Sequence, residues 1–220
     1  MDKKKLALIV GCIVLSGLLI DLVVLFPWER PELSWAINID DEFVFNATFS
    51  GYVEYPENTT YGQTVLSRLA NTTIIAKIAS LPTPNILTTD DFLTLTSTTI
   101  VTSRFSNGSD IPTDVSTELN RLVSKLFIPT GAWKYLDSLF PDNATDAGQH
   151  EFWCDTYFTR LYETSFIFGH RRYLSDSGSW WHGVVSCSNG VPQLIVSSSM
   201  SYVPPYVAYS WTFHLELVDD

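Results

Sequence analysis

Four histidines, at positions 150, 170, 182 and 214, are the side chains of this sequence best suited to proton transfer or metal binding. They form neither H-x-x-x-H nor H-E-x-x-H, the spacings with which one helix presents two imidazoles to zinc. The sequence also has no G-x-S-x-G nucleophile elbow and no glycine-rich phosphate-binding motif. We therefore predict no catalytic residue, no metal site and no cofactor. The catalytic alternative is a hydrolase, which would need His170, His182 and Asp155 in one pocket.

Aromatic side chains are the second group that could recognise a ligand. Adjacent residues of a strand point to opposite faces, so Trp180 and Trp181 are expected on opposite sides of a sheet. One indole would pack in the core, and the other, Trp180, would be exposed. Exposed rings on a sheet can stack on sugars or hold a protein partner, which makes Trp180, His182 and Tyr206 the predicted ligand contacts. The alternative is that these rings pack under covering elements.

Five N-x-Ser/Thr sequons predict glycosylation and therefore a location outside the cell. Their asparagines are Asn46, Asn58, Asn71, Asn107 and Asn143. Chance matches in a threonine-rich chain are the alternative explanation.

Cysteine usage agrees with an oxidising compartment. Of the three cysteines, Cys12 lies in an apolar N-terminal run, which leaves Cys154 and Cys187 as an even pair. We predict a disulfide bond between these two, and the alternative is two buried free thiols.

The N-terminal run, residues 6–26, is 21 residues long and apolar enough to span the roughly 30 Å hydrocarbon core of a bilayer as a helix. Lys3, Lys4 and Lys5 precede it and predict a cytoplasmic N-terminus. The predicted organisation is a cytoplasmic tip (1–5), a transmembrane anchor (6–26), a juxtamembrane linker (27–36) and an extracellular domain (37–220). The alternatives are a cleaved signal peptide, although no small-x-small site closely follows the run, and lipidation at Cys12.

Acidic residues outnumber basic residues 24 to 13, and the formal net charge is −11. A nucleic-acid-binding protein needs a basic surface that displaces phosphate counterions, so this charge argues against a nucleic-acid partner.

Periodicity predicts the elements of the exterior domain. Residues 41–55 alternate with period two, placing Phe45 and Ala47 on one face and the Asn46 sequon on the other. Helical spacing of apolar residues predicts helices over 113–127 and 132–140. Strand compositions or alternations mark 73–79, 92–105, 151–162, 165–174, 180–188, 194–202 and 207–218, and the last five of these form a predicted antiparallel meander. Asn189-Gly190 predicts a tight hairpin that sets Val185 opposite Leu194.

Together these elements predict an α+β fold, in which a transmembrane helix precedes a mainly antiparallel β domain with one or two helices. A β-sandwich and a curved half-barrel packed on a helix are the alternatives. The predicted function is a single-pass, membrane-anchored cell-surface protein whose exterior domain binds or assembles without catalysis. Its partners would be the bilayer, through residues 6–26, and a protein or glycan outside. A half-barrel that binds lipid or a small ligand, and a membrane-tethered hydrolase, are the alternative functions.

Overall fold

A computed structural model of the chain describes residues 32–53, 64–140, 154–174, 176–203 and 206–218. The chain divides into two compact units, Met1–Glu32 and Leu33–Asp220, and every described helix and strand belongs to the second. The predicted anchor at 6–26 and the sequons of Asn58 and Asn143 lie outside the described residues.

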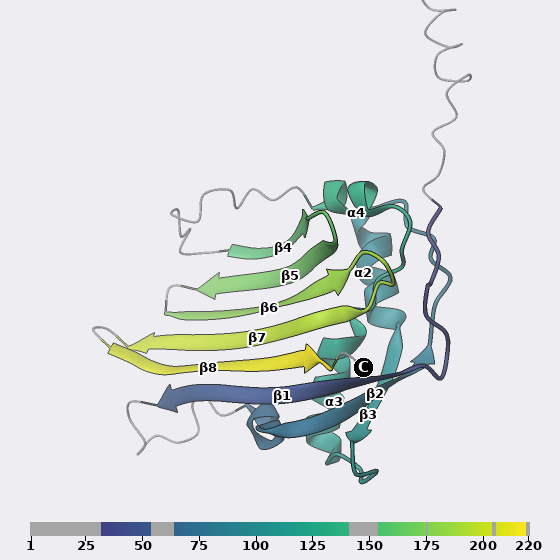
Figure 1. The fold of residues 1–220 in the computed structure, drawn as a ribbon. Coiled ribbons are helices and arrows are strands. Elements are labelled where there is room, and N and C mark those ends of the chain that lie inside the picture. The colour runs from purple at the N-terminus through teal and green to yellow at the C-terminus, as the bar shows by residue number, and fades with distance from the viewer. Residues whose placement is uncertain (1–31, 54–63, 141–153, 175, 204–205, 219–220) are drawn as a thin grey trace, which may run out of the picture. The chain divides into compact units, whose positions relative to one another are not determined.

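Eight antiparallel strands form one sheet, in the order β3-β2-β1-β8-β7-β6-β5-β4 (Figure 1). The strands are β1 (Glu42–Val53), β2 (Thr72–Ser80), β3 (Ile100–Phe105), β4 (Cys154–Leu161), β5 (Ser165–Leu174), β6 (Ser177–Ser186), β7 (Pro192–Val203) and β8 (Tyr206–Leu217). Strands β4 to β8 are consecutive neighbours, so the predicted meander is confirmed. Strand β8 pairs with β1, which joins the N-terminal strands and the meander into one continuous sheet.

The α-helices cover one face of this sheet, lying behind the strands in Figure 1. They are α2 (Thr89–Thr98), α3 (Thr113–Ser124) and α4 (Trp133–Leu139), and a 3-10 helix, η2 (Val65–Leu69), precedes β2. Aromatic rings join the two layers, with centroids 4.9 Å apart for Phe92 and Phe168 and 5.2 Å apart for Trp133 and Phe166. The predicted helices over 113–127 and 132–140 are confirmed with shorter bounds.

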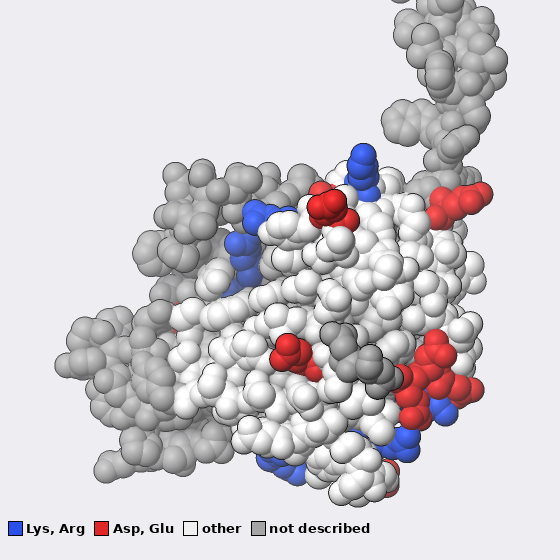
Figure 2. Space-filling view, in the orientation of Figure 1, with Lys and Arg blue, Asp and Glu red and all other residues white. Residues whose placement is uncertain are grey.

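Strand β1 follows its predicted alternation, because Phe45 and Ala47 are buried and Asn46 and Thr48 are exposed. We use the term inner face for the sheet face that carries Phe45 and packs against the helices, and outer face for the opposite one. Figure 2, in the orientation of Figure 1, shows the outer face, where charged side chains gather mainly near the rims and most of the central surface is uncharged.

The predicted fold class is wrong. The described residues form a single eight-stranded antiparallel sheet with three short α-helices, not an α+β fold that begins with a transmembrane helix. None of the helices in the described part of the chain is both long and apolar enough to cross a membrane. Periodicity identifies strands but does not identify their partners, and the pairing of β1 with β8 is what makes one sheet of all eight.

Residues 92–105, predicted as one strand, form most of helix α2 and all of strand β3. The Thr88 hydroxyl accepts a hydrogen bond from the Asp91 N–H, and the Asp91 carboxylate accepts one from the Thr88 N–H. This capping box satisfies N–H groups that a helix start otherwise leaves free. Phe92 and Leu95 then face the core at helical spacing, which overrides the β propensity of the threonines.

The predicted register of the β6–β7 hairpin is also wrong. Val184, and not Val185, pairs with Leu194, and the ladder shifts between Val184 and Val185. The turn is wider than a two-residue hairpin, because the Gly190 N–H donates to Ser186 O and Ser186 N–H donates to Val191 O.

Candidate functional site

The inner face changes character along each strand of the meander. Near the helices it carries fully buried Phe168, Ile195 and Phe213, all 0% exposed. Toward the other end of the same strands, which extends beyond the helices in Figure 1, the inner-face positions are partly or fully exposed. We refer to these regions as the covered end and the open end.

Serines and aromatic residues dominate the open end, and we name this region the serine–aromatic surface. Ladder pairing places Trp181 next to Ser197, and Trp211 next to Ser199. Ser179 also pairs with Ser199, so small hydroxyl side chains fill the space between the two tryptophans. The members are Tyr157, His170, Ser179, Trp181, Ser197, Ser199 and Trp211.

The hydroxyls of Ser179, Ser197 and Ser199 have no side-chain partner among the described residues, and all three residues are at least partly exposed. Ser198, on the outer face between two of them, is buried and donates a hydrogen bond to the Thr212 hydroxyl at 2.8 Å. The inner-face hydroxyls are therefore the ones free to bond a ligand.

A histidine–carboxylate pair borders this surface on strands β4 and β5. His170 Nε2 lies 2.7 Å from Asp155 Oδ1, and Arg172 Nε lies 3.7 Å from Asp155 Oδ2. The Tyr157 ring contacts the His170 ring with centroids 4.5 Å apart, and Tyr157 is 38% exposed. Asp155 thus holds the imidazole in position while its own side chain stays 63% exposed.

Lys125 follows helix α3 and brings a positive charge to the boundary between the two ends. Its Nζ lies 5.0 Å from the centroid of the Trp181 ring. Burial lowers the pKa of the Lys125 ammonium, the charge of Arg121 lowers it further, and the charge of Glu118 raises it. Glu118 itself is hydrogen-bonded to Arg121, at 2.7 Å. In the described part of the chain no carboxylate forms an ion pair with Lys125. The Trp181 ring contacts this half-buried cation directly, and Glu118 acts on it only at longer range.

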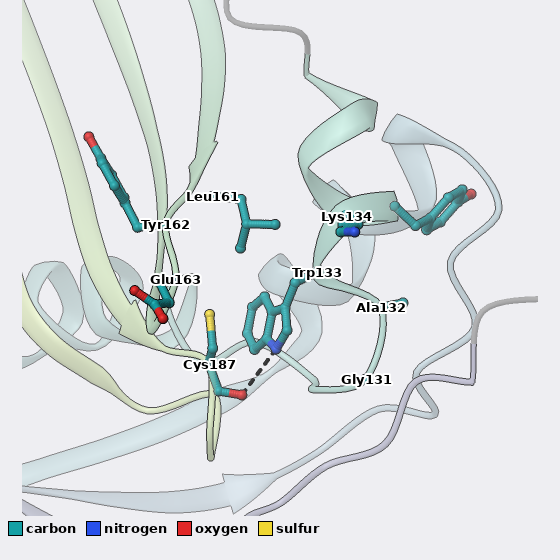
Figure 3. A pocket seen from close by; sticks show the side chains of 9 residues that line it. Gly131, Ala132, Trp133, Lys134, Leu161, Tyr162, Glu163 and Cys187 are labelled. Carbon is teal, nitrogen blue, oxygen red and sulfur yellow. Dashed lines mark hydrogen bonds between the residues drawn. The ribbon is translucent and has the colours of Figure 1, made fainter.

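Apart from the serine–aromatic surface, the protein has an open depression of about 740 Å³. It lies at the C-terminal end of strand β4, between the start of α4 and the β4–β5 turn. Figure 3 shows Trp133 on one side and Cys187 facing it, with the Trp133 indole N–H donating to the Cys187 carbonyl at 3.0 Å. Trp133 also packs on Phe166, so its ring is held by the core. Burial raises the pKa of the Cys187 thiol, which keeps it protonated at neutral pH and weakly nucleophilic.

The predicted disulfide bond is not formed, and both Cys154 and Cys187 are free thiols. Cys154 begins β4 and pairs with Tyr173, whereas the Cys187 N–H donates to Thr164 O, just beyond the other end of β4. Seven residues of extended strand separate these points by roughly 20 Å, far more than a disulfide can bridge. Cys154 also lies on the outer face, at the position that pairs with Tyr173.

The predicted ligand contacts do not meet in the serine–aromatic surface. Trp180 and His182 both lie on the outer face, half-buried, with the Trp180 and Tyr173 ring centroids 6.3 Å apart. Tyr206 begins β8 opposite Val203, and its side chain is outside the described part of the structure. His170 and Asp155 of the hydrolase alternative are hydrogen-bonded, but His182 is on the opposite side of the sheet from them.

The three described sequons are all exposed. Asn46 lies on the outer face, where its side-chain oxygen accepts a hydrogen bond from the Thr73 hydroxyl. Asn71 occupies a turn with φ +58°, and Asn107 accepts hydrogen bonds from the N–H and hydroxyl of Ser109. Their use for glycosylation stays a prediction.

The residues that sequence reasoning missed are Tyr157, Lys125, Trp181 and the inner-face serines. One signal could have found the serines. In residues 195–201 every second residue after Ile195 is a serine, which marks the point where one face of the strand stops being apolar. Lys125 gave no such signal, because its position over Trp181 depends on how α3 packs.

The fold and this surface define a single-sheet antiparallel protein with helices over one end of one face. Within the described residues, no group of three or more His, Cys, Asp or Glu side chains is arranged to hold a metal ion. Comparison of the chain with protein-family models, with curated proteins and with solved structures finds no match.

Proposed function

We propose that this protein is a non-catalytic binding protein of the cell surface, whose ligand is recognised by the serine–aromatic surface. The observation that carries the proposal is the change on one sheet face from buried apolar residues to partly or fully exposed serines flanked by Trp181 and Trp211. Aromatic rings combined with free hydroxyls are suited to a ligand that has both flat apolar faces and polar edges.

The location outside the cell is part of this proposal. The apolar segment 6–26, preceded by three lysines, would hold the chain at a lipid bilayer with the N-terminus in the cytoplasm. The exposed sequons Asn46, Asn71 and Asn107 are consistent with an exterior domain. A protease added to intact cells should then degrade a C-terminal tag, and a tag that is cut only after lysis would contradict the location.

The binding surface can be tested by blocking it. Ser199→Phe adds a ring to the open end of the inner face, and Met200→Phe makes a similar change on the outer face of the same strand. The full chain in detergent micelles would be applied to immobilised neutral oligosaccharides, acidic oligosaccharides and polyglutamate. We expect Ser199→Phe to weaken binding at least tenfold and Met200→Phe to leave it within twofold. Equal effects of the two variants, or no binding to any probe, would overturn the proposal.

A further inference from the structure

The Lys125 side chain is half-buried, and its ammonium has no ion-pair partner among the described residues. This combination indicates which kind of ligand group could bind next to it. Burying a charge without a partner of opposite sign is unfavourable. Lys125 has the Trp181 ring beneath it, and Glu118, the carboxylate whose charge favours it, bonds to Arg121. An anionic group on a ligand would supply the missing charge at this point.

A second feature is that two positively charged side chains lie beside one surface of a protein whose net charge is negative. The chain has a net charge of −11, yet Lys125 and Arg172 both border the serine–aromatic surface. Asp155, on the same sheet face, is within ion-pair distance of both His170 and Arg172. Asp155 therefore does not pair with Lys125, whose ammonium can still bind an anionic group.

The uncharged part of the surface favours a sugar over a peptide as the carrier of that anionic group. Strands β6 and β8, which carry Trp181 and Trp211, are two strand spacings apart, roughly 10 Å. The hydroxyls of Ser197 and Ser199 lie between them and can donate to and accept from sugar hydroxyls. Strands β6 and β7 each pair with a neighbouring strand on both sides, so neither offers a peptide a free strand edge to extend.

We propose that the ligand is an acidic saccharide, whose carboxylate or sulfate group pairs with Lys125 while its ring packs beside Trp181. This inference rests on the proposed function.

The test uses the full chain in detergent micelles and matched charge variants. Lys125→Met removes the ammonium but keeps the length of the side chain, and Lys134→Met removes an exposed lysine elsewhere, with the same change in net charge. The probes are oligogalacturonate, which carries carboxylates, a heparin hexasaccharide, which carries sulfates, neutral cellohexaose and chitohexaose, and polyglutamate. Circular dichroism and thermal unfolding would check that each variant is folded.

We expect one of the two acidic oligosaccharides to bind more tightly than the neutral ones. Lys125→Met should weaken that binding about ten- to one-hundred-fold, the range for a hydrogen bond to a charged group, and Lys134→Met should leave it within twofold. The stronger of the two acidic probes identifies the anionic group as carboxylate or sulfate.

Two outcomes would overturn this inference while leaving the proposed function in place. In the first, neutral oligosaccharides bind as tightly as acidic ones and Lys125→Met has no effect, although Ser199→Phe still abolishes binding. In the second, polyglutamate binds in a manner sensitive to Ser199→Phe and the saccharides do not bind. Insensitivity of all binding to Ser199→Phe would instead remove the proposed function itself.

Discussion

The covered end and the open end of the inner face are formed by the same strands, yet they carry different side chains. In β7 the inner-face residues run from Ile195 through Ser197 to Ser199, and in β8 they run from Phe213 to Trp211. Ile195 and Phe213 are fully buried, whereas the other three are partly exposed. One half of a single strand can thus belong to the core while the other half forms a surface. Whether a residue serves stability or binding therefore depends on its burial and not on the strand to which it belongs.

Truncating one inner-face side chain at each end should separate the two ends most clearly. Phe213→Ala deletes a fully buried ring and should lower the free energy of unfolding by about 3–5 kcal/mol. Ser199→Ala, one strand away at the open end, should change it by no more than about 0.5 kcal/mol. Urea unfolding followed by tryptophan fluorescence measures both, and a comparable loss in the two variants would show that the open end is also core.

Adding volume to one strand tests the boundary between the ends. A Cβ on Gly183 would lie 2.7 Å from a Leu126 methyl carbon, so Gly183→Val should cost about 1–3 kcal/mol of unfolding free energy. Ser179→Val makes a related change four residues earlier on the same face, where the side chain is exposed, and should cost no more than about 0.5 kcal/mol. A large loss of unfolding free energy in Ser179→Val would instead indicate that another segment covers the open end.

Lys125 lies between the two ends, and its effect on stability should differ from its effect on binding. Because burial lowers the pKa of its ammonium, the folded state disfavours the charged form. Lys125→Met should therefore leave the free energy of unfolding unchanged or raise it, by at most about 0.5 kcal/mol. Thermal unfolding at neutral pH checks this, and a marked loss of stability would mean that Lys125 is structural.

The outer face carries a histidine whose titration should affect stability. This residue, His182, is half-buried and follows Trp181 on β6, so it lies on the opposite side of the sheet from the serine–aromatic surface. Burial lowers the pKa of His182, and the charge of His214 lowers it further. The unfolded state therefore takes up a proton more readily than the folded state, so stability should fall as the pH drops below about 6.5 and level off below the folded-state pKa. Urea unfolding across this range should show a smaller decline for His182→Gln, and an identical decline would assign the effect to other groups.

The sequence predicted the strands of the meander, the two helices over 113–127 and 132–140, and the alternation of Phe45 and Asn46. These features depend on local periodicity, which the sequence displays directly. It did not predict α2, because threonine-rich composition concealed the capping box of Thr88 and Asp91. It also did not predict the β1–β8 pairing, the shifted β6–β7 register or the separation of Cys154 from Cys187, since these depend on which distant segments meet.

The candidate site was less accessible to sequence reasoning than the fold. The opposite orientation of Trp180 and Trp181 followed from their adjacency, but the choice between them required the position of the helices. Trp181 lies on the inner face, with its ring centroid 5.3 Å from that of Phe168, and Trp180 lies on the outer face, opposite the described helices. Trp180 was predicted to be the exposed ring, but both rings are half-buried, and the serines with free hydroxyls and Lys125 lie on the side of Trp181.

The most direct test of the central claim compares these two adjacent tryptophans. The dissociation constant of the oligosaccharide that binds the full chain most tightly would be measured for Trp181→Ala and Trp180→Ala, with circular dichroism confirming that both variants are folded. If the inner face binds the ligand, Trp181→Ala should raise the dissociation constant at least tenfold, about 1.4 kcal/mol, and Trp180→Ala should leave it within twofold. The reverse order, or equal effects, would contradict the assignment of ligand binding to the serine–aromatic surface.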